Sequence, residues 1–209
     1  MKQRHTSRSL RRSAAIAAPI LAAGLATAAV APSAQAAPGP TKTYTASLSM
    51  GCKATSPIAV DLGTWTGSVS VDLPSSAASG DQLAPPPLKA TINVPGSATS
   101  AMSLIGAKNI LSGTAKAPYS VTGAVASPGN RSANLTVANT PIPITGGQPV
   151  TTTATGVGQA ETASGSGNAV VQIQSPISIA LVTDSPTSPN VAVTCTLPSP
   201  VTLATIPVS

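Results

Sequence analysis

The sequence predicts an all-β fold, an immunoglobulin-like β-sandwich with one short helix and one disulfide. Three observations lead to this expectation. Short segments of alternating apolar and polar residues recur along the chain, and turn-forming residues separate them at intervals of about 8 to 12 residues. Abundant threonine and valine, with 21 prolines, form the composition of many short strands joined by turns. Two cysteines lie near opposite ends of the predicted domain.

The first 36 residues have the pattern of a secretory signal peptide. Five basic residues precede an apolar run at 14–30, and a small-x-small pattern ends at Ala36. We therefore expect one domain over 37–209, secreted or loosely attached outside the cell, with no membrane span in the mature protein. That range holds six Lys and Arg against five Asp and Glu, a net charge of +1 (6 − 5). Cations scattered singly predict no nucleic-acid partner.

The first expected strand, 43–52, alternates almost without interruption. Its apolar residues, from Tyr44 to Cys52, fall on one parity, which is typical of a strand with one buried face.

A change of phase follows in the next two segments. We expect either a β-bulge at Gly63 or a tight hairpin turn, because a bulge would keep both segments facing the core. The apolar residues concerned are Ile58, Val60 and Leu62 in the first segment, and Trp65, Val69, Val71 and Leu73 in the second.

One short helix interrupts the strands. Residues 74–87, rich in Pro and Ser, predict a loop, and 88–95 alternate as a strand. The apolar spacing then becomes helical, which predicts a helix at about 97–106 with Ser97 as its N-cap and Gly106 as its stop.

Strand patterns resume after the helix and continue to the end of the chain, with one loose loop at 157–168. The expected strands are 109–115, 119–126, 133–139, 141–145, 149–159, 168–174, 176–184, 190–198 and 201–208.

The two cysteines lie on the inward parity of their strands. Cys195 shares its parity with Val191, Val193 and Leu197, as Cys52 does with the apolar residues before it. In an exported protein, two inward cysteines predict one disulfide, and two separate buried thiols are the alternative.

Few groups are available for catalysis. The only histidine, His5, lies in the signal segment, so Ser-His-Asp and Cys-His catalysis and a zinc site are not expected in the mature chain. The acidic residues are isolated, which disfavours calcium, and no phosphate-binding glycine motif is present. We therefore expect that the protein binds no cofactor and no metal and that it is not an enzyme. Asp61 and Asp72, expected on neighbouring strands, are the best pair for a glycosidase, but solvated strand charges are the stronger interpretation.

Four segments resemble a known family: YTASLSMGC near the mature start, PGSATSAMSLIGAKNILSGTA in the middle, and VAVTCTLPSP and LATIPV near the end. They are similar to secreted actinobacterial β-domains known only as a domain of unknown function, over roughly 41–208. The resemblance implies export, a disulfide between Cys52 and Cys195, and a β-sandwich. It implies no activity and no functional residues.

We therefore expect a secreted, non-catalytic extracellular domain with a structural or protein-interaction role, whose partner is a protein or the cell wall. A carbohydrate- or cell-wall-binding module is the first alternative, and a carboxylate-dependent glycosidase is the second. Sugar binding would need an exposed aromatic side chain, and the mature chain has three aromatic residues, Tyr44, Trp65 and Tyr119. We expect all three in the core, with Trp65 beside the disulfide.

Overall fold

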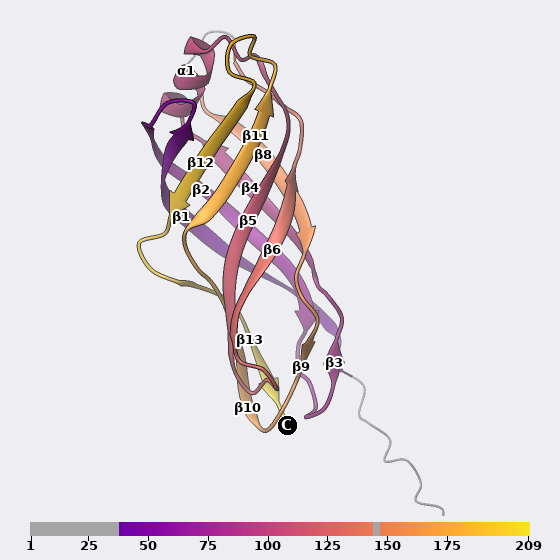
Figure 1. The fold of residues 1–209 in the computed structure, drawn as a ribbon. Helices are drawn as coiled ribbons and strands as arrows, with labels where there is room; N and C mark the ends of the chain where they lie inside the picture. The colour runs from indigo at the N-terminus through magenta and orange to yellow at the C-terminus, as the bar shows by residue number, and fades with distance from the viewer. Residues whose placement is uncertain (1–37, 144–146) are drawn as a thin grey trace, which may run out of the picture. The chain divides into compact units, whose positions relative to one another are not determined.

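A computed structural model describes residues 38–143 and 147–209, and the predicted signal segment, 1–36, lies outside the described residues. The described part contains thirteen strands and one helix (Figure 1). Their bounds are β1 Thr41–Ser56, β2 Val60–Pro74, β3 Gln82–Leu83, β4 Pro87–Val94, α1 Gly96–Leu104, β5 Asn109–Gly123, β6 Gly129–Val137, β7 Thr140–Pro141, β8 Val150–Val157, β9 Glu161–Thr162, β10 Gly167–Ile173, β11 Ile177–Thr183, β12 Asn190–Thr196 and β13 Val201–Val208.

The main sheet closes into an eight-stranded antiparallel β-barrel, so the predicted immunoglobulin-like sandwich is wrong. Hydrogen-bonded neighbours run in the order β11, β12, β1, β2, β4, β8, β6 and β5. β5 then pairs with β11, for example Ala115 with Ile179, and this pairing closes the ring. The all-β class, the short helix and the disulfide are confirmed. Alternation cannot distinguish the two architectures, because one face of each strand is buried in both.

β5 is one long strand where the sequence predicts two. Residues 110–116 pair with β11, and residues 119–123 pair with β10. Pro118 stands at the change of partner, where its lack of an N–H costs no ladder bond, and its carbonyl accepts the N–H of Gln174 at 2.9 Å. β10 and β13 thus extend the wall beyond β11 and β12 (Figure 1), and β13 packs beside β1 without forming a ladder with it.

The alternation of the first strands is confirmed. In β1 every second residue from Ala46 to Ala54 is buried, and the residues between them are exposed. In β2 the side chains of Trp65, Val71 and Leu73 are buried in the same core.

The bulge at Gly63 is confirmed as well. Leu62 and Gly63 together oppose Cys52 of β1, and Gly63 has φ +79°, a conformation that glycine adopts without steric cost. The prediction for the segment before it is wrong in part: Leu62 is buried, but Ile58 is 67% exposed and Val60 is 42% exposed. These two residues lie at the tip of the β1–β2 hairpin, beyond the core.

The helix α1 lies at one end of the barrel, about where the sequence predicts it (Figure 1). Ser97 is not its N-cap. Pro95 occupies that position without a side-chain cap, and the Ser97 hydroxyl instead donates to the carbonyl oxygen of Leu62 at 3.0 Å. Gly106 follows the helix with φ +78°, as the predicted C-terminal stop requires.

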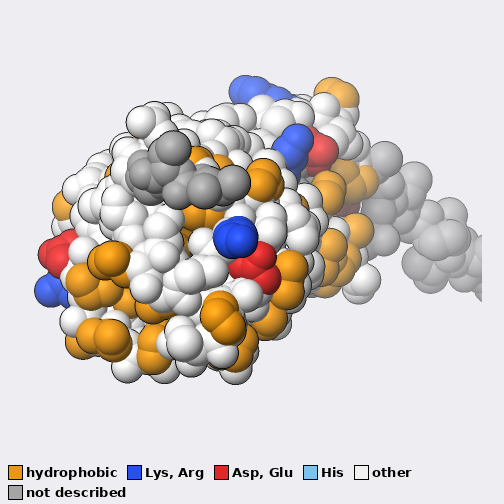
Figure 2. Space-filling view, turned by 90° about the horizontal axis from the view of Figure 1, so that it is seen from above, with side chains coloured by type: hydrophobic (Ala, Val, Ile, Leu, Met, Phe, Trp, Pro, Cys, Tyr) orange, Lys and Arg blue, Asp and Glu red, His pale blue; other side chains and the backbone are white. Residues whose placement is uncertain are grey.

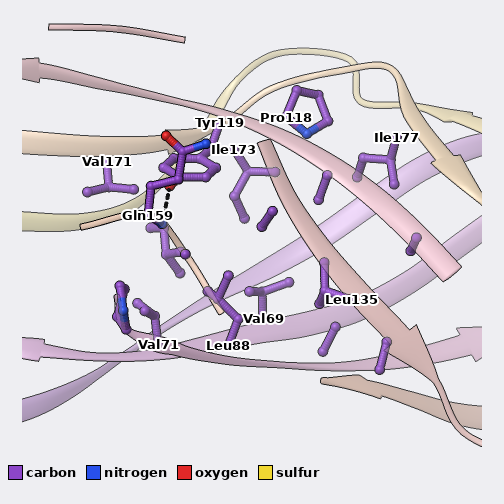
Figure 3. A pocket seen from close by; sticks show the side chains of 18 of the residues that line it. Val69, Val71, Leu88, Pro118, Tyr119, Leu135, Gln159, Val171, Ile173 and Ile177 are labelled. Carbon is purple, nitrogen blue, oxygen red and sulfur yellow. Dashed lines mark hydrogen bonds between the residues drawn. The ribbon is translucent and has the colours of Figure 1, made fainter. Parts of the chain in front are cut away.

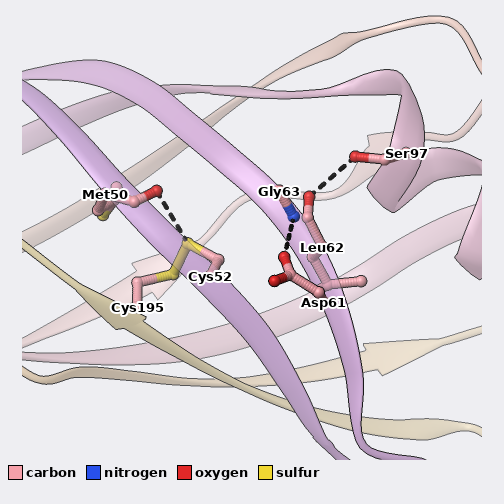
Figure 4. The surroundings of a disulfide bond; sticks show 7 residues. All are labelled: Met50, Cys52, Asp61, Leu62, Gly63, Ser97 and Cys195. Carbon is pink, nitrogen blue, oxygen red and sulfur yellow. Dashed lines mark hydrogen bonds between the residues drawn. A yellow bond between two sulfur atoms is a disulfide. The ribbon is translucent and has the colours of Figure 1, made fainter.

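The disulfide joins two directly opposed residues of β1 and β12. Cys52 and Cys195 are partners in the ladder, and both are fully buried (Figure 4). The Sγ of Cys52 lies 3.8 Å from the carbonyl oxygen of Met50. Because a disulfide sulfur carries no proton, this is a packing contact. Trp65 pairs with Met50, so the buried tryptophan lies close to the bridge along the sheet, as expected.

Two predicted loops each contain a very short strand. β3, within the predicted loop 74–87, pairs with β9, within the predicted loop 157–168. This β3–β9 sheet lies at the end of the barrel away from α1 (Figure 1). Of the expected strand 141–145, Pro141 is in β7, and residues 144 and 145 lie outside the described residues.

The surface at the α1 end is mostly neutral. Figure 2 shows few charged side chains there, standing singly or in small groups among polar and apolar ones. Over the described residues, no helix is long and apolar enough to cross a bilayer.

Candidate functional site

The barrel encloses a cavity of about 150 Å³. Its wall is built from the inward side chains of the barrel strands, with contributions from β10 and β13, and it is almost wholly aliphatic. Figure 3 shows side chains converging on it from several strands, among them Val69, Val71, Leu88, Leu135, Val171 and Ile173. A void with such a lining excludes water, since a buried water needs two to four polar partners.

Small side chains explain why the barrel is hollow. Ala90 of β4 is the direct partner of Ala154 of β8, and Ala117 of β5 is the direct partner of Ala133 of β6; we call these four residues the alanine pairs. All four line the cavity. An eight-stranded barrel is just wide enough for side chains to fill or for one small ligand. The chain has no phenylalanine, and its one tryptophan does not line the cavity, so Tyr119 is the aromatic residue of the lining.

The cavity reaches the surface beside the β3–β9 sheet. Two of its lining residues are exposed, Ala84 and Gln159. Ala84 directly follows β3, and Gln159 precedes β9 by two residues. Leu83 and Pro86, also in the lining, are half-buried beside them. The mouth of the cavity therefore lies at the end opposite α1.

Tyr119 is one of the polar residues of the wall at this end. It is half-buried on β5, and its hydroxyl oxygen accepts the backbone N–H of Gln159 at 2.9 Å (Figure 3). Burial raises the pKa of Tyr119 above its ordinary value; the hydrogen bond from Gln159 opposes this shift, and nearby Glu161 adds to it. The phenol therefore stays protonated at neutral pH and keeps a proton to donate.

An ion pair fixes β9 against β6 at the mouth. The Arg131 Nε lies 2.8 Å from one Glu161 oxygen, and its Nη2 lies 3.2 Å from the other. Arg131 also donates to the carbonyl oxygens of Ser127 and Asn130. The bond to Glu161 raises the pKa of the guanidinium further, so Arg131 stays charged. Glu161 lines the cavity, and its carboxylate is held by Arg131.

The structure does not bring the candidate glycosidase residues together. The sequence interpretation put Asp61 and Asp72 on neighbouring strands, but both lie on β2, eleven residues apart, which corresponds to roughly 35 Å of extended strand. A glycosidase needs two carboxyl groups within about 10 Å. Asp72 accepts the Thr43 hydroxyl at 2.6 Å, and Asp61 accepts the N–H of Gly63 at 2.8 Å. Both side chains are exposed.

The aromatic residues do not form an exposed platform. Trp65 is 3% exposed in the core, and Tyr119 faces the cavity. Tyr44 is half-buried, with the Lys42 amine 5.0 Å from its ring centroid. Across residues 38–143 and 147–209, no three His, Cys, Asp or Glu side chains gather as a metal site would require.

Sequence reasoning missed the cavity, Gln159 and the importance of Tyr119, which it placed in the core. The usable signal was alanine at inward strand positions in a chain without phenylalanine. That signal indicates a wide barrel only once the sheet is known to close.

Comparison with known proteins agrees with the resemblance in its coarser form. No curated protein and no solved structure matches the chain. A family model described as a family of unknown function (DUF6801) matches residues 43–204. This range spans the barrel from β1 into β13 and includes both cysteines and every lining residue named above. The match covers most of the chain, so this protein belongs to the family of unknown function DUF6801.

Proposed function

We propose that this protein is a non-catalytic extracellular binding domain that holds a small apolar molecule inside its barrel. The observation that carries the proposal is the cavity of about 150 Å³ with its aliphatic wall and its mouth beside the β3–β9 sheet. An engineered cavity of about this size, with a similar lining in another protein, stays dry and takes up benzene. The matching ligand class is a molecule of one ring or a short alkyl chain.

The energetic cost of an empty cavity supports a binding role. At about 24 cal/mol per Å³, a void of 150 Å³ lowers the free energy of unfolding by about 4 kcal/mol. Domains are stable by only about 5–15 kcal/mol in total, so this is a large fraction. Larger residues at the alanine pairs would remove the cost. A ligand that fills the cavity also removes it, because binding to the folded state stabilises that state.

The groups around the cavity support binding over catalysis. Its wall offers Tyr119 and Glu161 as titratable side chains, and the Glu161 carboxylate is held by Arg131. Among the lining residues that the structure describes, neither has a histidine or a second free carboxylate beside it for proton transfer. The predicted export agrees with the disulfide, since disulfides persist in oxidising compartments. The exposed faces of the strands, rich in Ser and Thr, remain available for a protein or cell-wall partner.

A methyl NMR titration tests the proposal directly. Benzene or hexane is added to the isotope-labelled mature domain, and we expect the methyl signals of Val69, Leu88 and Val171, which line the cavity, to shift in a saturable way. The methyl signals of Val94 and Val193, buried elsewhere in the core, serve as the matched control and should not move. Shifts of equal size in both groups, or none at all up to the solubility limit of both probes, would contradict a cavity ligand.

A further inference from the structure

The polar groups of the cavity wall are concentrated at its mouth. Thr152 is the polar side chain deeper in the barrel, and it is buried with its hydroxyl bonded to that of Thr140 at 2.7 Å. The other polar lining side chains, Tyr119, Gln159 and Glu161, belong to the end beside the β3–β9 sheet. A ligand in this cavity therefore meets hydrocarbon along most of its length and polar atoms at one end.

Tyr119 offers that end a hydrogen-bond donor. Its hydroxyl oxygen already accepts the N–H of Gln159, and among the described residues the hydroxyl donates no hydrogen bond of its own. A phenol that lacks an acceptor in a half-buried position keeps an unused donor, and a ligand acceptor placed there would satisfy it. Because burial raises the pKa of Tyr119, the donor is present across the physiological pH range.

The charges at the mouth select an uncharged acceptor. Glu161 lines the cavity, so an anionic head group would be placed beside a carboxylate. The compensating cation, Arg131, is already engaged by both oxygens of Glu161 and by two backbone carbonyls. A cationic head group would have to replace Arg131 at Glu161. A neutral carbonyl avoids both costs and accepts one hydrogen bond.

We infer that the ligand is amphipathic, with a short hydrocarbon portion against the alanine pairs and one uncharged hydrogen-bond acceptor, such as a ketone or ester carbonyl, bonded to the Tyr119 hydroxyl. This inference rests on the proposed function, since it assigns the chemistry of a ligand in the same cavity. The barrel wall supplies the binding energy through burial of hydrocarbon, and Tyr119 fixes which end of the ligand faces the mouth.

The inference is tested by measuring the affinities of two ligands for the wild-type protein and for one variant. Hexane and 2-hexanone differ by the carbonyl group, and Tyr119→Phe removes the hydroxyl while keeping the ring that packs in the wall. We expect Tyr119→Phe to weaken the binding of 2-hexanone about two- to tenfold, which is the range of one net hydrogen bond. The affinity for hexane should stay unchanged. Tyr44→Phe removes the hydroxyl of a tyrosine that does not line the cavity, and it should change neither affinity.

Hexanoate at pH 7 completes the set, and we expect it to bind more weakly than 2-hexanone. The head-group assignment would be overturned if Tyr119→Phe weakened the binding of hexane and 2-hexanone equally, or weakened neither. Tighter binding of hexanoate than of 2-hexanone would also overturn it. In each of these cases the cavity proposal would still stand. If neither hexane nor 2-hexanone binds the wild-type protein, both the assignment and the proposed function fail. Methyl shifts of the lining residues provide the measurement in every case.

Discussion

Ala90 and Ala154 are direct partners across β4 and β8, and both methyl groups point into the barrel, where their neighbours leave a void. At this position, two of the smallest side chains face each other in a wall that also carries many valine, leucine and isoleucine residues. The pair thus contributes to the width of the cavity, and the size of the cavity can be changed here without altering the outside of the protein.

Ala154→Leu should fill part of the cavity. We expect the free energy of unfolding to rise by about 0.5–2 kcal/mol, the usual gain from filling a void, and hydrocarbon binding to fall below detection. Chemical denaturation and the methyl titration measure the two effects. Ala180→Leu, on the outer face of β11, adds the same side chain in an exposed position and should change neither quantity. A loss of stability with retained binding would mean that the methyl of Ala154 does not face usable space.

Gly63→Ala should destabilise the bulge of β2. Gly63 has φ +79°, and a Cβ there would lie 2.9 Å from the Ser97 hydroxyl oxygen, which bonds Leu62. We expect a loss of about 1–2 kcal/mol in the free energy of unfolding, from backbone strain and the disturbed contact to α1. Gly51→Ala is the matched control on β1, because a Cβ there meets no atom within 4 Å. Equal effects of the two substitutions would argue against this origin.

Cys52→Ser should remove a large part of the stability. The disulfide closes a loop with a sequence separation of 143, for which the chain-entropy model gives about 5 kcal/mol as an upper-end figure. Urea denaturation of the variant and of the reduced wild-type protein should give similar midpoints, both well below that of the oxidised protein. Titration of the native protein should find no free thiol. Two free thiols in the folded protein would contradict the bridge.

Asp184 should make stability depend on pH in acid. Its carboxylate accepts the backbone N–H groups of Lys108 and Asn109 and the Asn109 side-chain amide, at 2.7 to 2.8 Å. These bonds, the Asn109 amide first, lower the pKa of Asp184 below its ordinary value of 3.8. A lowered folded-state pKa contributes stability above the unfolded-state value, and this stability is lost as the pH falls through the folded-state value.

Asp184→Asn should therefore be less stable than wild type at pH 6, and the difference should shrink as the pH falls below about 4. Denaturation midpoints measured from pH 2.5 to pH 7 test this. A difference that stays constant over the whole range would show that the substitution acts through packing and not through the charge.

Trp65 should be protected from solvent. It is the only tryptophan, and its side chain is 3% exposed, so acrylamide should quench its fluorescence far less than that of free tryptophan. Addition of cell-wall polysaccharide should leave the emission unchanged. Strong quenching, or a shift on addition of polysaccharide, would favour the carbohydrate-binding alternative.

The local structure of the strands could be predicted from the sequence, but the closure of the sheet into a barrel could not. The two-residue period of 43–52 predicts the buried face of β1, and the phase change at Gly63 predicts a bulge that the register confirms. These are properties of neighbouring residues. The pairing of β5 with β11 joins residues more than sixty positions apart, and nothing in the alternation of either strand specifies its partner.

The cavity could not be predicted without the closure of the barrel. Ala90, Ala117, Ala133 and Ala154 belong to four strands, and only the closed barrel makes them surround one space. The pairing of Asp61 with Asp72 was wrong for a related reason. The phase change at Gly63 was compatible with a bulge or with a hairpin turn, and only the hairpin would have placed the two residues on adjacent strands.

The pairing of β1 on both edges has a consequence for how the chain folds. β2, the first partner, follows directly, but β12 is the second partner and is completed only at Thr196. Until the chain has been released as far as β12, β1 has an open edge, which other chains can pair with. Contacts of such long sequence separation form slowly. The pairing of β1 with β12 is thus among the last to form, and oxidation of Cys52 with Cys195 then joins these two strands covalently.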